Sequence, residues 1–148
     1  MRKPKLVFRI LIVEDDADRT EILKSWIPDD VRTVVVSSAG KAMGLLARDR
    51  GDVYGGILLD HDLQLQTATE KDRFLCGNDV VNAVIANISR DVPIFVHSAN
   101  VQRAPVMASR LENSDFWVTR IPMYDLKKEQ LREWVEDARE LWEDRNDE

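Results

Sequence analysis

The sequence is short of cysteine and of long apolar runs. Cys76 is the only cysteine among 148 residues, so the chain can form neither an internal disulfide nor a four-cysteine zinc site, as suits a reducing cytoplasm. No apolar run approaches the roughly 20 residues that a membrane helix needs, and the start of the chain lacks a signal-peptide cleavage region. We therefore expect a cytoplasmic protein that does not enter a membrane.

The sequence also lacks a concentration of positive charge. It has 21 Lys and Arg against 27 Asp and Glu, with a net charge of −6 and the two signs interspersed, so we expect no direct binding of nucleic acid. At 44% hydrophobic residues, the chain can bury one ordinary core. We predict a single domain over residues 1–148, with its core at about 7–142 and a frayed acidic tail at 143–148.

Strand-like and helix-like patterns alternate along the chain. Asp16 and Ser38 stand where they can cap the first two helices, and a last helix is predicted from about Leu126. Five strands and five helices in alternation predict an α/β fold: a doubly wound, flavodoxin-like parallel sheet of order 2-1-3-4-5 with helices on both faces. Residues 64–76 show no clean period and are predicted to form a long loop. The predicted strands are residues 7–13, 32–37, 56–59, 93–96 and 116–119.

Carboxylates follow two strands that the predicted order makes neighbours. Glu14 and Asp15 follow the first strand, and Asp60 follows the third. Acidic groups at adjacent strand ends repel one another unless a cation joins them, and oxygen ligands favour Mg²⁺ or Mn²⁺ over Zn²⁺. We therefore predict a hard-metal site. The alternative is that the acidic residues only cap and begin the next helix, which Asp16 alone would explain.

The fourth and fifth strands deliver groups that suit phosphate. Ser98 follows the fourth strand and Arg120 follows the fifth. A phosphate oxygen can complete the shell of a bound metal, a carboxylate can attack phosphorus, and a hydroxyl and a guanidinium can hold the developing charge. Plainer readings stay open, because a hydroxyl is common at a strand end and Arg120 could serve only as a partner of the carboxylates.

At these residues the sequence resembles the receiver domain of two-component response regulators. The strings LIVEDD, ILLDHDL and PIFVHSA carry the resemblance, which covers roughly residues 7–142. It implies that Glu14 and Asp15 bind Mg²⁺ and that Asp60 is both a metal ligand and the phosphoacceptor. It also implies that the backbone carbonyl of Asp62 is a metal ligand and that Ser98 binds the phosphoryl group.

Two departures from the receiver pattern bear on function. The family has Lys followed by Pro after the fifth strand, whereas this chain has Thr119-Arg120-Ile121-Pro122. The planar guanidinium of Arg120 therefore stands where the family has the compact ammonium of a lysine. The strings DHDL and HSAN are similar to a receiver-like branch that is predicted to process cyclic phosphates, such as those of cyclic nucleotides or ADP-ribose derivatives.

The two histidines have two readings. If strand alternation persists, His61 lies opposite Asp60 and His97 lies opposite Ser98, so both imidazoles are expected to face away from the phosphate as structural residues. If the strand ends are irregular, either histidine could supply the acid–base chemistry that cleavage of a cyclic phosphate needs.

Three functions are compatible with these residues. The preferred hypothesis is a stand-alone receiver that is phosphorylated on Asp60 by a sensor histidine kinase or a phosphotransfer protein. The alternative is a metal-dependent phosphoesterase acting on a small cyclic phosphate, with His61 and His97 as added catalytic residues. A third hypothesis, a degenerate receiver that serves as an interaction module, is disfavoured because the acidic residues are intact. The oligomeric state stays open.

Overall fold

A five-stranded parallel sheet organises the chain in the computed structural model, which describes residues 7–61 and 77–146. The strand order is β2-β1-β3-β4-β5, and every neighbouring pair is parallel, which confirms the predicted fold. The elements in chain order are β1 Arg9–Val13, α1 Ala17–Trp26, β2 Arg32–Val36, α2 Ala39–Arg48, β3 Gly56–Leu59, α3 Gly77–Asn87, β4 Ile94–Val96, α4 Ala104–Asn113, β5 Val118–Arg120 and α5 Lys128–Asn146.

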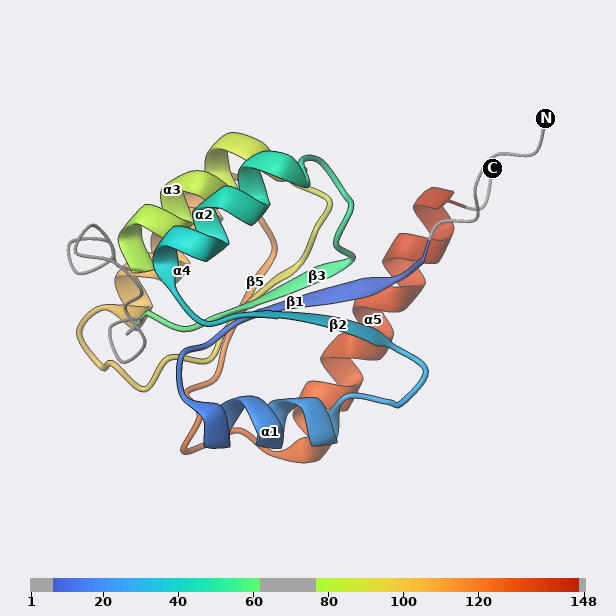
Figure 1. The fold of residues 1–148 in the computed structure, drawn as a ribbon, viewed down its shortest axis with the longest axis horizontal. Helices are drawn as coiled ribbons and strands as arrows, with labels where there is room; N and C mark the ends of the chain where they lie inside the picture. The colour runs from blue at the N-terminus through green and yellow to red at the C-terminus, as the bar shows by residue number, and fades with distance from the viewer. Residues whose placement is uncertain (1–6, 62–76, 147–148) are drawn as a thin grey trace.

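Helices cover both faces of the sheet (Figure 1): α1 and α5 lie on one face, and α2, α3 and α4 on the other. Successive strand residues alternate between the two cores. On β1, for example, Ile10 and Ile12 belong to the α1/α5 core, whereas Leu11 and Val13 belong to the α2/α3/α4 core. This alternation decides which side chains meet at the carboxyl end of the sheet.

Local sequence signals fix the beginnings of the first two helices. The Asp16 side chain accepts a hydrogen bond from the backbone N–H of Arg19 at 2.9 Å, and Ser38 accepts one from Lys41 at 3.2 Å. Both residues therefore cap their helices as predicted, each satisfying a backbone donor that has no partner within its helix.

The end of the chain differs from the prediction. Helix α5 continues to Asn146, so residues 143–146 are helical rather than frayed. Side-chain contacts anchor this last turn: Arg145 donates to the carbonyl of Asp91 at 3.0 Å, and Asn146 donates to the carbonyl of Trp142 at 2.8 Å. The predicted loop 64–76 and Asp62 lie outside the described residues. Among the described helices, none has the length and the apolar character to cross a bilayer.

Candidate functional site

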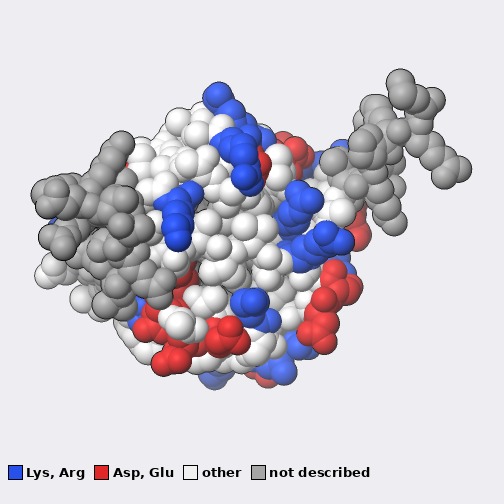
Figure 2. Space-filling view, in the orientation of Figure 1, with Lys and Arg blue, Asp and Glu red and all other residues white. Residues whose placement is uncertain are grey.

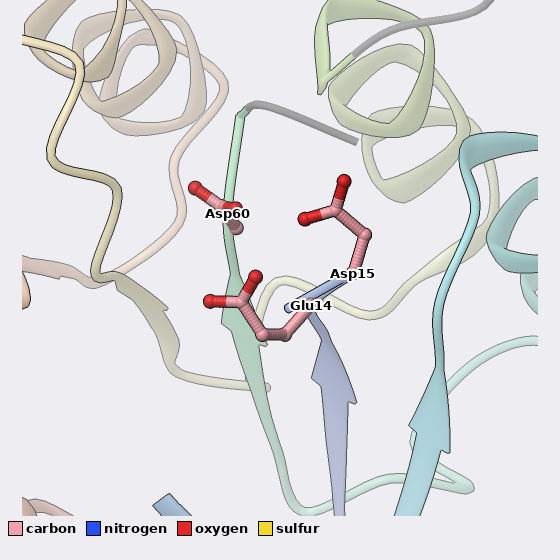
Figure 3. A group of neighbouring side chains, drawn as sticks. All are labelled: Glu14, Asp15 and Asp60. Atoms are coloured by element: carbon pink, nitrogen blue, oxygen red, sulfur yellow. The ribbon is translucent and has the colours of Figure 1, made fainter. Parts of the chain in front are cut away.

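Three carboxylates gather at the carboxyl ends of two central strands. Glu14 and Asp15 follow β1, Asp60 follows β3, and one oxygen from each lies within 4.8 Å of the others. Figure 3 shows the three side chains around one space beyond these strands. All three residues are at most 3% exposed, and Glu14, Asp15 and Asp60 are called the acidic cluster below. The structure thus brings together the three side chains that the sequence predicted as metal ligands.

The sheet register explains why an imidazole joins the acidic cluster. Ile12 pairs with Leu58, and Leu58 pairs with Phe95. Two residues further along each strand the same row contains Glu14, Asp60 and His97, since side chains on one face recur with a period of two.

His97 contacts the acidic cluster directly. Its Nε2 lies 3.1 Å from Oε1 of Glu14, and the residue is 1% exposed. Of the two readings of His97, the one in which its imidazole faces away is wrong, because that reading assumed that Ser98, and not His97, lies on the same face of the sheet as Asp60. Ser98 is also buried, and its hydroxyl accepts a hydrogen bond from the backbone N–H of Asn100 at 3.2 Å. Its role in binding a phosphoryl group stays a prediction.

His61 lies on the other side of β3, beside the start of α3. The backbone N–H of Gly77 donates to its carbonyl at 3.1 Å. A Cβ on Gly77 would lie 2.7 Å from the His61 Cα atom, so a larger residue at position 77 would collide with this backbone. The position matches the structural reading of His61, under a helix and opposite Asp60.

The sequence reasoning missed Arg19, the cation that the structure places in the acidic cluster. Its Nε donates to Oε1 of Glu14 at 2.8 Å and its Nη2 donates to Oε2 of Glu14 at 3.2 Å. Nη2 also lies 3.8 Å from Asp15 Oδ1 and 3.5 Å from Asp60 Oδ2. A cation in the first turn of a helix interacts unfavourably with the helix dipole unless an anion lies near it. The position of Arg19 in the first turn was therefore the one sequence signal that it has an acidic partner.

Arg120 is not brought to the acidic cluster. It is exposed and pairs in register with Val96, whereas Thr119 pairs with Phe95. The row that contains Asp60 and His97 therefore continues into Ile121, whose side chain packs against the α1/α5 core. A phosphate-binding role for Arg120 stays a prediction without a contact in the described residues to support it.

Glu14 and Asp60 differ in their tendency to ionise. Burial raises the pKa of Asp60 to about 8, and the neighbouring Glu14 carboxylate adds to the rise. Burial also acts to raise the pKa of Glu14, but hydrogen bonds from His97 and Arg19 outweigh it and hold this pKa well below its usual range. In the metal-free protein at neutral pH, Glu14 is therefore ionised and Asp60 is protonated.

The acidic cluster suits a hard divalent cation. Its donors are carboxylate oxygens, the type that Mg²⁺ and Mn²⁺ prefer. Oδ2 of Asp60 is buried and accepts no hydrogen bond from any described residue, so this oxygen has capacity for a ligand. A divalent cation bound at this oxygen would also offset the repulsion by Glu14 that contributes to the raised pKa of Asp60.

An open pocket gives access to one side of the acidic cluster. It has a volume of about 190 Å³ and is lined by Glu14, Asp15 and residues of α1 and the β2 end, namely Ala17, Thr20, Glu21, Val35 and Ser37. Figure 2 shows acidic side chains gathered over the start of α1, with basic side chains scattered across the rest of this face.

Comparisons with known proteins agree with this geometry. Residues 9–113 match the family model for the cyclic-phosphate processing receiver domain. No curated protein matches the chain.

Similar solved structures include a sensor protein from Polaromonas sp. JS666, with a TM-score of 0.62 and 23% identity over 88% of this chain and 94% of that one. Another is the receiver domain of the sensor histidine kinase PA1611 from Pseudomonas aeruginosa PAO1, with magnesium in its active-site cleft (TM-score 0.62, 20% identity, 89% and 97% covered). A third is the Mn²⁺-bound form of the response regulator Rcp1 (TM-score 0.60, 16% identity, 91% and 94% covered). These likenesses establish the fold.

Proposed function

The chain belongs to the family of cyclic-phosphate processing receiver domains, and from that membership we propose that its acidic cluster holds Mg²⁺ or Mn²⁺ and hydrolyses a small cyclic phosphate. The observation that carries this proposal is the hydrogen bond between His97 and Glu14, at 3.1 Å. Because of this bond the carboxylate site includes a buried imidazole, which can take part in the acid–base chemistry of hydrolysis. Without it, the carboxylates would suit only the acceptance of a phosphoryl group.

Glu14, Asp15 and Asp60 would be the side-chain ligands of the metal, with the backbone carbonyl of Asp62 as the further ligand implied by the receiver resemblance. Magnesium in the PA1611 cleft and Mn²⁺ in Rcp1 support this assignment. The bound ion supplies positive charge that polarises a phosphate oxygen and stabilises the transition state.

His97 is suited to move the proton. Because Glu14 is ionised and can only accept, the hydrogen of a neutral His97 lies on Nε2 and the lone pair lies on Nδ1. Nδ1 is buried and has no hydrogen-bond partner among the described residues. The carboxylate therefore selects the tautomer and orients the ring, as it does in other carboxylate–histidine pairs.

We assign the reaction as the addition of water across one ring P–O bond. The hydrogen-bonded His97–Glu14 pair takes a proton from the attacking water, whose oxygen bonds to phosphorus while the ring P–O bond breaks. The proton then passes to the departing alkoxide, so the products are a phosphate monoester and a free hydroxyl. No oxidant or further reactant is needed.

A second candidate function is phosphorylation of Asp60. Its carboxylate lies directly after β3, beside Glu14 and Asp15, which is the place that the receiver resemblance gives to the phosphoacceptor. A sensor histidine kinase or a phosphotransfer protein would be the donor, and Ser98 would bind the transferred group. In this case an Asp60 oxygen attacks phosphorus and the donor's P–N bond breaks.

One experiment separates the two functions. The purified protein is incubated with Mg²⁺ and either 2′,3′-cyclic or 3′,5′-cyclic nucleotides, and ring opening is followed by phosphorus NMR. In parallel it is incubated with a small phosphodonor, and its intact mass is measured. Asp60→Asn is the test variant, and Asp30→Asn, whose residue pairs with Arg139 on the surface, is the matched control.

Catalytic ring opening that Asp60→Asn abolishes would support the phosphoesterase. A stable increase of one phosphate in mass, without ring opening and absent in Asp60→Asn, would replace it with the phosphoacceptor. If neither reaction occurs, both proposals fail and a role as an interaction module is left.

A further inference from the structure

The structure places no cation of the described residues in the acidic cluster from the position after β5, where the receiver resemblance implies one. Arg120 is exposed there, and Ile121 continues the row of Asp60 and His97. The site nevertheless contains a guanidinium, because α1 supplies Arg19.

Arg19 occupies the centre of the acidic cluster. Its Nη2 lies within 4 Å of all three carboxylates, at 3.2 Å from Glu14, 3.8 Å from Asp15 and 3.5 Å from Asp60. The guanidinium thus supplies, in the metal-free protein, the positive charge that a metal would supply. Its own pKa is raised by the bond to Glu14, so Arg19 stays charged at every working pH.

A metal and this guanidinium compete for the same oxygens. Mg²⁺ binds its ligands at about 2.0–2.1 Å, and a second cation within 4 Å of the same three carboxylates is repelled by it. The Arg19 side chain is 35% exposed, whereas those of the three carboxylates are at most 5% exposed. If a metal displaces the guanidinium from the carboxylates, the Arg19 side chain therefore turns towards solvent, from which a ligand would enter.

We propose that Arg19 is a phosphate-binding residue, held among the carboxylates in the metal-free protein and turned towards an incoming phosphate when the metal binds. The inference rests on the proposed function, since it needs both the metal and the phosphate at this cluster. The backbone of Arg19 stays fixed by the Asp16 cap, so only the side chain has to move. A guanidinium at the cluster's edge can then bind two phosphate oxygens through its planar fork.

The test measures metal and phosphate binding separately, by calorimetry. Arg19→Met keeps the length of the side chain and removes its charge. Without phosphate, this variant should bind Mg²⁺ more tightly than the wild type, by roughly tenfold or more, because the competing cation is gone. In saturating Mg²⁺, its affinity for inorganic phosphate should fall by roughly tenfold or more. Arg139→Met is the matched control, because Arg139 makes a two-bond pair with Asp30, at 2.8 and 3.1 Å, away from the cluster.

A second variant keeps the test decisive if Arg19→Met does not fold without metal. Arg19→Lys retains the charge but loses the fork, so phosphate affinity should fall while Mg²⁺ affinity stays within a few fold of the wild type. If either variant of Arg19 binds phosphate as the wild type does, or if Arg19→Met binds Mg²⁺ no more tightly, the inference is overturned while the metal site stands. If the wild type itself binds no Mg²⁺, the proposed function fails, and the inference fails with it.

Discussion

Replacing Asp60 by Asn should stabilise the metal-free protein, although it removes a residue of the proposed site. The pKa of the Asp60 carboxyl is about 8 in the folded protein and about 3.9 in an unfolded chain. At pH 7 folding therefore requires Asp60 to take up a proton. Over the three pH units between 3.9 and 7, at 1.36 kcal/mol per unit, this costs about 4 kcal/mol. Asn carries no charge in either state, so Asp60→Asn avoids that cost.

The sign of the pH dependence follows from the same shift. Between pH 4 and pH 8 the folded state binds one more proton than the unfolded state at Asp60, so the contribution of Asp60 lowers the free energy of unfolding of the wild type as pH rises. The advantage of Asp60→Asn should be near zero at pH 4, should grow by about 1.4 kcal/mol per unit, and should level off above pH 8. For a chain of this size, 4 kcal/mol corresponds to roughly 10 °C in Tm.

Thermal unfolding of both proteins from pH 4 to pH 9, in a chelator, measures this difference. Glu14 and the other titrating groups are common to both proteins, so their contributions largely cancel in the comparison. Adding Mg²⁺ should then reduce or reverse the advantage of Asp60→Asn, because only the wild type has all three carboxylates. A variant that is less stable than the wild type by the same amount at every pH would refute the proposed charge distribution in the acidic cluster.

Three more predictions follow from the site and its support. Mg²⁺ should raise the Tm of the wild type in proportion to the logarithm of its concentration, and Asp15→Asn should lose most of that gain; a melting curve unchanged by Mg²⁺ would contradict the metal site. Because metal binding requires Asp60 to lose its proton, the apparent Mg²⁺ affinity should rise by up to about tenfold per pH unit between pH 6 and the Asp60 pKa of about 8, which calorimetry would show; an affinity independent of pH would exclude Asp60 as a ligand. Gly77→Ala should lower stability by roughly 1–3 kcal/mol in thermal unfolding, because its Cβ would meet the His61 backbone at 2.7 Å, whereas Gly44→Ala, with nothing within 4 Å, should not; equal effects at the two glycines would refute the packing argument.

The fold and the carboxylates could be predicted from the sequence because each has a local signal. Alternating strand and helix patterns define the parallel sheet, and a parallel sheet brings all its strand ends to one edge. Glu14, Asp15 and Asp60 are therefore expected to lie near one another even if the predicted end of each strand is wrong by about one residue.

The remaining site residues depend on details that the sequence leaves open. The fifth strand was predicted at residues 116–119 but spans Val118–Arg120, and a small change of register decides which of Arg120 and Ile121 lies in the row of Asp60. His97 reaches Glu14 because β4 pairs with β3 in one particular register. Arg19 reaches the acidic cluster through a long side chain whose path no periodic pattern encodes.

The rate of ring opening of a cyclic nucleotide in saturating Mg²⁺, by the wild type and by His97→Gln, tests the proposed reaction most sharply. An acid–base group typically contributes on the order of 10² to 10⁴ in rate. If the His97–Glu14 pair moves the proton, kcat should fall by a factor of that size in His97→Gln, with Mg²⁺ affinity retained and with His61→Gln much less affected. Ring opening at the wild-type rate in His97→Gln, or stable phosphorylation of Asp60 with no ring opening by the wild type, would show that the proposed reaction is wrong.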